Sequence, residues 1–145
     1  MTFKHLDDQT AVAPQLLPHD IPALVEAGFD TVICNRPDVE VPPEASSEAL
    51  RAACEAAGLT FVDNPLAAGG LTMETINAQA EAIDDAKGQI LAYCASGTRS
   101  ALLWAFASAV SGKHSPENIE AALENGGYPF PGVAQQLASV AGTSR

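Results

Sequence analysis

The stretch at residues 89–100 reads Gln-Ile-Leu-Ala-Tyr-Cys-Ala-Ser-Gly-Thr-Arg-Ser, and it decides the fold. Its first five residues, Gln89 to Tyr93, are apolar enough and short enough for a buried strand. A loop of small residues follows, and an apolar helix is expected to begin at Arg99. Cys94 therefore lies where a strand ends and a helix is about to start. In parallel α/β sheets this is the edge at which ligands bind.

This loop is a candidate anion site with a nucleophile in its floor. Backbone N–H groups and the positive end of the following helix should converge on one spot, and Arg99 adds a planar cation beside it. In that setting Cys94 should exist largely as thiolate, the nucleophilic form. Gly97 permits the backbone twist that turns the amides inward. The predicted anion-binding residues of the loop are Ala95, Ser96, Gly97, Thr98, Arg99 and Ser100. Ser100 is expected to hydrogen-bond the Cys94 sulfur.

The length of the loop bears on the chemistry. The motif resembles that of tyrosine and dual-specificity phosphatases, which place five residues between cysteine and arginine and usually a histidine before the cysteine. Here four residues separate Cys94 from Arg99, and Tyr93 precedes the cysteine. Rhodanese-type sulfurtransferases also use a six-residue loop. A tighter ring of amides suits a persulfide sulfur better than a phosphoryl group with three equatorial oxygens, which tilts the prediction toward sulfur transfer.

Two motifs resemble those of a narrower family, the phosphatase-like domain of beta-lactamase hydrolase-like proteins. These are Asn-Arg-Pro-Asp-x-Glu at residues 35–40 and Tyr-Cys-x-x-Gly-x-Arg-Ser at residues 93–100, with a late Gly-Tyr at residues 127–128. The resemblance implies a dual-specificity-phosphatase-like fold and an activity disputed between phosphatase and sulfurtransferase. Some relatives are fused to a persulfide-handling metallo-hydrolase domain, which implies a possible persulfide-metabolising enzyme as partner.

The rest of the chain alternates predicted strands and helices. Strands are expected at 3–6, 9–13, 29–34, 59–63 and 89–93, and helices at 18–27, 46–57, 72–87, from 99, from 116 and after 131. Glycines follow several of the helical segments, and Ser and Thr precede them, as stop and capping signals require. Strands bridged by helices predict an α/β fold: a central, mostly parallel sheet with helices on both faces. We expect one phosphatase-like domain over residues 1–145.

Parallel strand ends meet at one edge, and this rule selects further candidates. Asp63 lies 31 residues before Cys94, about where dual-specificity phosphatases carry a general acid, although a turn residue is the more common role of such an aspartate. Arg36 could hold a second anionic group of the substrate, or could pair with Asp38 or Glu40 to support the turn. Cys34 and Cys54 are expected to be buried. Tyr128 could line the mouth of the pocket or pack against the last helix, and packing is the favoured role.

Composition restricts the partners. Eighteen acidic and seven basic residues give a net charge of −11, which argues against nucleic acid or an anionic membrane as partner and favours a small anionic sulfur or phosphate substrate. The start of the chain lacks an apolar export signal and no apolar run is long enough to cross a membrane, so a cytoplasmic protein is expected. Three irregularly spaced cysteines and scattered histidines predict neither a metal site nor a cofactor.

Three functions follow from these residues. In the first, Cys94 carries a sulfane sulfur as a persulfide from thiosulfate or a small persulfide to a thiol or to cyanide. In the second, Cys94 attacks a phosphate monoester, Arg99 clamps the phosphoryl oxygens and Asp63 protonates the leaving group. In the third, the loop binds an anion without turnover. The loop length favours the sulfurtransferase, and the resemblance in fold together with Asp63 favours the phosphatase.

Overall fold

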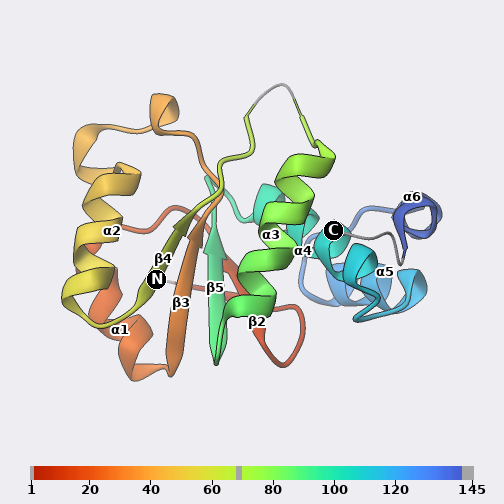
Figure 1. Ribbon diagram of the computed structural model, residues 1–145, viewed down its shortest axis with the longest axis horizontal. Coiled ribbons are helices and arrows are strands. Elements are labelled where there is room, and N and C mark those ends of the chain that lie inside the picture. Colours follow the sequence, from red (N-terminus) through yellow and green to blue (C-terminus); the bar gives the residue numbers. More distant parts are fainter. Residues whose placement is uncertain (1, 68–69, 142–145) are drawn as a thin grey trace.

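A computed structural model describes residues 2–67 and 70–141 (Figure 1). It contains one five-stranded sheet with the strand order β1-β2-β5-β3-β4. Only β1 is antiparallel to its neighbour, and the other pairings are parallel. The strands are β1 (Lys4–His5), β2 (Thr10–Ala13), β3 (Phe29–Cys34), β4 (Thr60–Asp63) and β5 (Gln89–Tyr93). The predicted mostly parallel α/β fold is thus confirmed.

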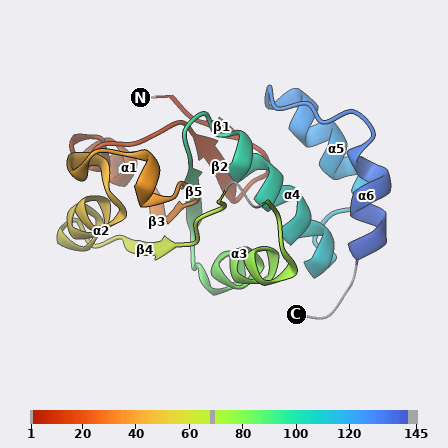
Figure 2. The ribbon, with the colours of Figure 1, turned by 90° about the horizontal axis from the view of Figure 1, so that it is seen from above.

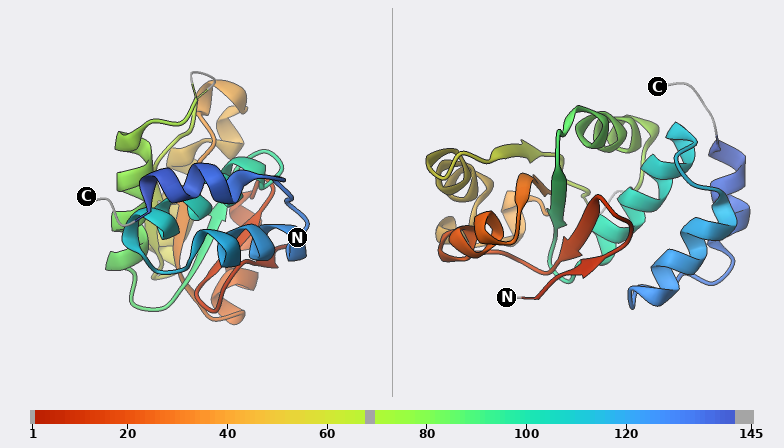
Figure 3. Two further views of the ribbon diagram at one scale, coloured as in Figure 1. Left: turned by 90° about the vertical axis from the view of Figure 1, so that its right-hand side faces the viewer. Right: turned by 90° about the horizontal axis from the view of Figure 1, so that it is seen from below.

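Helices cover both faces of this sheet, as the sequence predicts. The α-helices are α1 (Ile21–Glu26), α2 (Ser47–Ala56), α3 (Met73–Asp85), α4 (Thr98–Ser111), α5 (Pro116–Asn125) and α6 (Val133–Val140). Short 3-10 turns are η1 (Pro18–Asp20), η2 (Asp38–Glu40) and η3 (Pro43–Ala45). Seen from above, α1 and α2 lie on one side of the sheet and α3 and α4 on the other (Figure 2). Helices α5 and α6 pack outside α4 as a further layer (Figure 3).

The two faces have separate apolar cores. On the side of α1 and α2 the core includes Phe61 and Tyr93, and on the side of α3 and α4 it includes Trp104. Helix α4 is buried over most of its length because it lies between the sheet and the α5–α6 layer, which explains its nearly continuous apolar sequence. Among the described residues, no helix has both the length and the apolar character needed to cross a membrane.

The local signals in the sequence account for the helix ends. The hydroxyls of Ser46, Thr72 and Ser115 accept hydrogen bonds from backbone amides in the first turns of α2, α3 and α5. Gly112 ends α4 in the left-handed conformation, at φ 71°. Because β5 and β4 both pair with β3 in parallel, Cys94 follows β5 at the same edge at which β3 and β4 end.

Candidate active site

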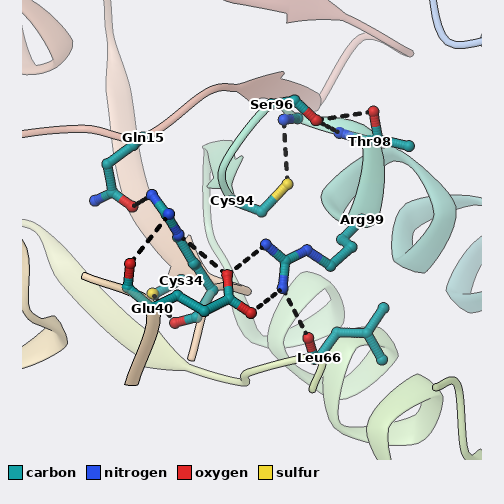
Figure 4. A network of polar contacts seen from close by, with 10 residues as sticks. Gln15, Cys34, Glu40, Leu66, Cys94, Ser96, Thr98 and Arg99 are labelled. Atoms are coloured by element: carbon teal, nitrogen blue, oxygen red, sulfur yellow. Dashed lines mark hydrogen bonds and ion pairs between the residues drawn. The ribbon is translucent and has the colours of Figure 1, made fainter. Parts of the chain in front are cut away.

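Cys94 follows β5 directly and lies in the floor of the loop that leads into α4. Its side chain is completely buried, and the backbone N–H of Gly97 donates to its sulfur over 3.1 Å (Figure 4). Gly97 has φ 94°, a left-handed conformation that side-chain-bearing residues rarely adopt, and it precedes the first residue of α4. The predicted inward twist of the loop at Gly97 is thus present, and it aims one amide at the nucleophile.

The remaining loop residues stabilise this turn. The Ser96 hydroxyl donates to Thr98 Oγ1 over 3.0 Å and accepts from the Thr98 amide over 3.4 Å. The carbonyl of Ala95 accepts from the Gln15 amide at 3.4 Å, which ties the loop to the segment after β2. Because α4 starts immediately afterwards, its dipole adds positive potential at this end of the loop.

Arg99 points back over the sheet edge toward Glu40. Its Nη1 and Nη2 donate to the two carboxylate oxygens of Glu40 over 3.1 and 2.8 Å, and Nη1 also donates to the Leu66 carbonyl at 3.1 Å. These three bonds use three of the five guanidinium N–H groups. The Nε–H and the second Nη2–H remain, and they form the side edge of the guanidinium. This edge has the geometry of a bidentate donor to two anion oxygens.

Arg36 forms the other side of the same ion-pair network. Its Nε donates to Glu40 Oε1 at 3.2 Å, its Nη2 to the Glu40 carbonyl at 3.2 Å and its Nη1 to Gln15 Oε1 at 3.2 Å. The pairing of Arg36 with a carboxylate, one of the two predicted alternatives, is present with Glu40 as the partner. Glu40 therefore accepts hydrogen bonds from two guanidinium groups, and its bonds to Arg99 are drawn in Figure 4.

The charges of this network reinforce one another. The hydrogen bond from Arg99 holds the pKa of Glu40 below its ordinary value, with a smaller contribution from Arg36. Pairing with Glu40 raises the pKa of Arg99, and the nearby Cys94 sulfur contributes in the same direction. Glu40 thus stays ionised and Arg99 stays charged close to the sulfur.

Ser100 does not make the expected bond. Its hydroxyl donates to Asn35 Oδ1 over 2.8 Å, away from the predicted acceptor, the Cys94 sulfur. Asn35 in turn donates from Nδ2 to the Asn64 carbonyl and to Gln79 Oε1, each at 2.9 Å. Asn64 Nδ2 donates to the same Gln79 oxygen at 2.8 Å. A buried network of amide side chains thus holds the first turn of α4 in place, and the Ser100 hydroxyl connects α4 to this network.

Asp63 lies at the end of β4, on the side of α2. Phe61 faces the core under α1 and α2, and strand alternation turns Asp63 to that side as well. Tyr93 belongs to the same core, so alternation turns Cys94 to the opposite face. Burial raises the pKa of Asp63, and the neighbouring charge of Asp38 raises it further. The direction of this shift suits an acid, whereas the placement does not favour one acting at Cys94.

The other two cysteines are buried, as predicted. Cys54 is in the core, and Cys34 donates from its sulfur to the Arg36 carbonyl at 3.3 Å. Burial raises the pKa of both thiols, which disfavours reactivity there. Cys34 lies beside the hydroxyl of Tyr93, on the face of the sheet turned away from Cys94.

Tyr128 contacts the loop in addition to making the predicted packing contacts. It packs against the core as expected, but its hydroxyl also donates to the Ser96 carbonyl over 3.3 Å. A residue far along the chain thus reaches the loop. Glu40 was likewise not predicted as the partner of Arg99, since 59 residues separate them. An acidic residue just beyond the end of β3 was the only available signal.

The geometry defines a class: an α/β fold of the tyrosine-phosphatase type with a cysteine at the end of the central strand and an arginine that opens the next helix. The chain belongs to the family of the phosphatase-like domain of beta-lactamase hydrolase-like proteins, whose model matches residues 2–111. The predicted family is therefore confirmed. Helices α5 and α6 lie beyond the matched range.

Known proteins agree with this assignment. A beta-lactamase hydrolase-like protein of Xylella fastidiosa is 28% identical over 121 residues, which are 83% of this chain. The chain spans only 28% of the length of that relative. A candidate phosphatase of Neisseria meningitidis, solved by crystallography, is 29% identical with a TM-score of 0.79, covering 97% of this chain and 99% of that one.

A more distant structure shares the fold alone. PTPMT1 in complex with PI(5)P is 18% identical with a TM-score of 0.73, and the match covers 95% of this chain and 93% of that one. This neighbour binds a phosphate-bearing ligand. The comparisons thus support a phosphatase-like protein and give no support to the sulfur transfer that the loop length favours.

Proposed function

We propose that this chain hydrolyses small phosphate monoesters through a phosphocysteine at Cys94. The observation that carries the proposal is the side edge of Arg99, formed by Nε–H and one Nη2–H, which the bonds to Glu40 and Leu66 leave facing the Cys94 sulfur. Two parallel N–H donors match two oxygens of a phosphoryl group. The phosphatase-like family and fold support the same reading.

The reaction would proceed in two displacements. The Cys94 thiolate attacks phosphorus, the S–P bond forms and the P–O bond to the leaving group breaks. Water then attacks phosphorus, the S–P bond breaks, and inorganic phosphate and the thiolate are released. The Gly97 amide and Arg99 favour the charge on sulfur and on the phosphoryl oxygens in both steps.

The first displacement also depends on the fate of the leaving group. An alkoxide needs a proton donor within hydrogen-bond reach, whereas a phenolate with a low pKa departs without one. Asp63 has a pKa raised by burial, as an acid requires, but it lies on the face of the sheet turned away from Cys94. If Asp63 is this acid, Asp63→Asn should slow hydrolysis of an alkyl phosphate and leave that of 4-nitrophenyl phosphate nearly unchanged.

The experiment is hydrolysis of 4-nitrophenyl phosphate by the wild type, Cys94→Ser and Cys54→Ser, a matched loss of a buried thiol in α2. We expect turnover by the wild type and Cys54→Ser and none by Cys94→Ser. A phosphorylated Cys94, trapped by acid quench and located by mass spectrometry, would identify the intermediate. Equal turnover by all three proteins, or no turnover by any, would count against the proposal.

A second candidate function is sulfur transfer, which the four-residue spacing between Cys94 and Arg99 favours. The Cys94 thiolate would attack the outer sulfur of thiosulfate, the S–S bond would break and sulfite would leave. An acceptor thiolate or cyanide would then take the sulfur and restore the thiolate. A persulfide-metabolising enzyme is the partner that this alternative implies.

Intact mass after brief exposure to thiosulfate separates the two enzymes. A gain of one sulfur atom on the wild type but not on Cys94→Ser, lost on addition of a thiol, would support sulfur transfer. No gain, together with hydrolysis of the phosphate ester, would support the phosphatase. A Cys94 inert in both assays would leave the anion-binding module.

A further inference from the structure

A single peptide group connects Tyr128 to the nucleophile. The carbonyl of the Ser96–Gly97 peptide accepts the hydrogen bond from the Tyr128 hydroxyl at 3.3 Å. The N–H of the same peptide donates to the Cys94 sulfur at 3.1 Å. Because a trans peptide is planar, its C=O and N–H point in opposite directions. The bond to Tyr128 on one side therefore sets the direction of the donor on the other.

Backbone sterics alone do not hold this peptide in place. Rotation of the group by half a turn requires a change in ψ of Ser96 and in φ of Gly97. Glycine tolerates φ of either sign, so the reversed peptide is accessible at Gly97, which has φ 94°. In the reversed state the carbonyl oxygen would face the Cys94 sulfur and oppose the thiolate. A restraint from outside the loop is needed to exclude this state.

Tyr128 is placed to supply that restraint. A Cβ atom added to Gly97 would lie 2.3 Å from the Tyr128 hydroxyl oxygen and 2.9 Å from Cζ, so the ring lies directly against the loop. The Tyr128 amide donates to the Leu123 carbonyl at 2.9 Å, and the ring packs against the core under α4. Burial and the neighbouring Cys94 raise the pKa of Tyr128, so its hydroxyl stays a donor.

We propose that Tyr128 is a positioning residue that locks the Ser96–Gly97 peptide with its N–H on Cys94. The bond to the carbonyl also polarises the peptide and strengthens the N–H as a donor. The lock comes from the segment between α5 and α6, beyond the range that the family model matches. The proposal rests on Cys94 as the nucleophile of the proposed function, but not on the identity of the substrate.

The test is the rate of Cys94 alkylation by iodoacetamide as a function of pH in Tyr128→Phe, with the modified cysteine located by mass spectrometry. Loss of the lock should lower the rate at neutral pH about three- to tenfold, as expected for one hydrogen bond between neutral groups, and move the profile to higher pH. With 4-nitrophenyl phosphate, kcat should fall by a similar factor while KM changes little.

Tyr93→Phe is the matched control, because it removes a buried hydroxyl that lies beside Cys34 on the other face of the sheet. This variant should keep the wild-type alkylation profile. An unchanged profile in Tyr128→Phe, or an equal shift in Tyr93→Phe, would overturn the proposal, even if the melting temperature fell. If no phosphate ester is hydrolysed but the profile shifts, the proposed function fails and the positioning role stands.

Discussion

At the scale of single residues, Glu40 determines which N–H groups of Arg99 face the Cys94 sulfur. The carboxylate pairs with the outer edge of the guanidinium, and the Leu66 carbonyl occupies a further N–H. The side edge thereby stays beside the Cys94 sulfur, where the proposed substrate would bind. The ion pair is about one third exposed at Glu40, so its value lies in orientation rather than in stability.

Replacement of this carboxylate should therefore impair binding of an anion more than folding. We expect Glu40→Gln to lower kcat/KM for 4-nitrophenyl phosphate about tenfold, since the amide replaces one of the two accepting oxygens by an NH₂ group that cannot accept from Arg99. The melting temperature should change by no more than a few degrees. Glu44→Gln, at an exposed acidic residue of η3, removes the same charge and should match the wild type. Equal losses in both variants would assign the effect to net charge.

At the scale of elements, Asp7 connects the turn between β1 and β2 to α4 and to the α4–α5 connection. One oxygen accepts from the backbone amides of Gln9 and Thr10 over 2.9 and 2.7 Å. The other accepts from Trp104 Nε1 at 3.3 Å and lies 3.0 Å from His114 Nε2. The edge of the sheet is thus attached to the helical layer by one carboxylate.

This attachment should depend on pH. Burial alone would raise the pKa of Asp7, but the hydrogen bonds from His114 and the two amides outweigh it and lower the pKa. Because the folded pKa lies below the unfolded one, the stabilisation is complete above the ordinary value and is lost as the pH falls through the lowered value. Asp7→Asn should lower the free energy of unfolding by about 1–2 kcal/mol at neutral pH.

Urea unfolding of the wild type and Asp7→Asn from pH 7 to pH 2 measures this contribution. The two curves of stability against pH should converge at the acid end. Asp8→Asn, at the exposed neighbouring residue, is the matched control and should follow the wild type throughout. A constant difference at every pH would mean that the loss arises from packing instead of charge.

The elements were largely predictable because their signals are local. Short apolar runs after stop glycines predicted both ends of β3 and β5 correctly, and capping hydroxyls predicted the starts of α2, α3 and α5. The site was predictable only where it is local too, in the loop from Cys94 to Arg99. The bonds of Arg99 to Glu40 and of Tyr128 to Ser96 depend on how distant segments pack, and no local pattern encodes them.

At the scale of the whole molecule, the chain combines a net charge of −11 with a candidate site for anions. The negative electrostatic potential of the whole protein should repel a small dianion before it reaches Arg99. Salt weakens this repulsion, because the screening length is only about 10 Å at 0.1 M. Binding of an anionic substrate should therefore improve with salt, the opposite of the behaviour of a basic protein.

We expect kcat/KM for 4-nitrophenyl phosphate to rise about two- to threefold between 10 and 150 mM ionic strength. Alkylation of Cys94 by neutral iodoacetamide should stay nearly constant over the same range and serves as the internal control. A fall in kcat/KM with salt would mean that the local field of Arg36 and Arg99 dominates the approach of the substrate.

The complete burial of Cys94 has a consequence for the cell chemistry that this thiol meets. A nucleophile without exposed surface reacts only when the residues around it move apart for a short time. A larger reagent needs a larger movement, so the reaction is selective for small reagents. Small species such as hydrogen peroxide would reach the sulfur more readily than glutathione disulfide. The cysteine would then tolerate the mixed disulfides that inactivate open thiols, and remain sensitive to the smallest oxidants.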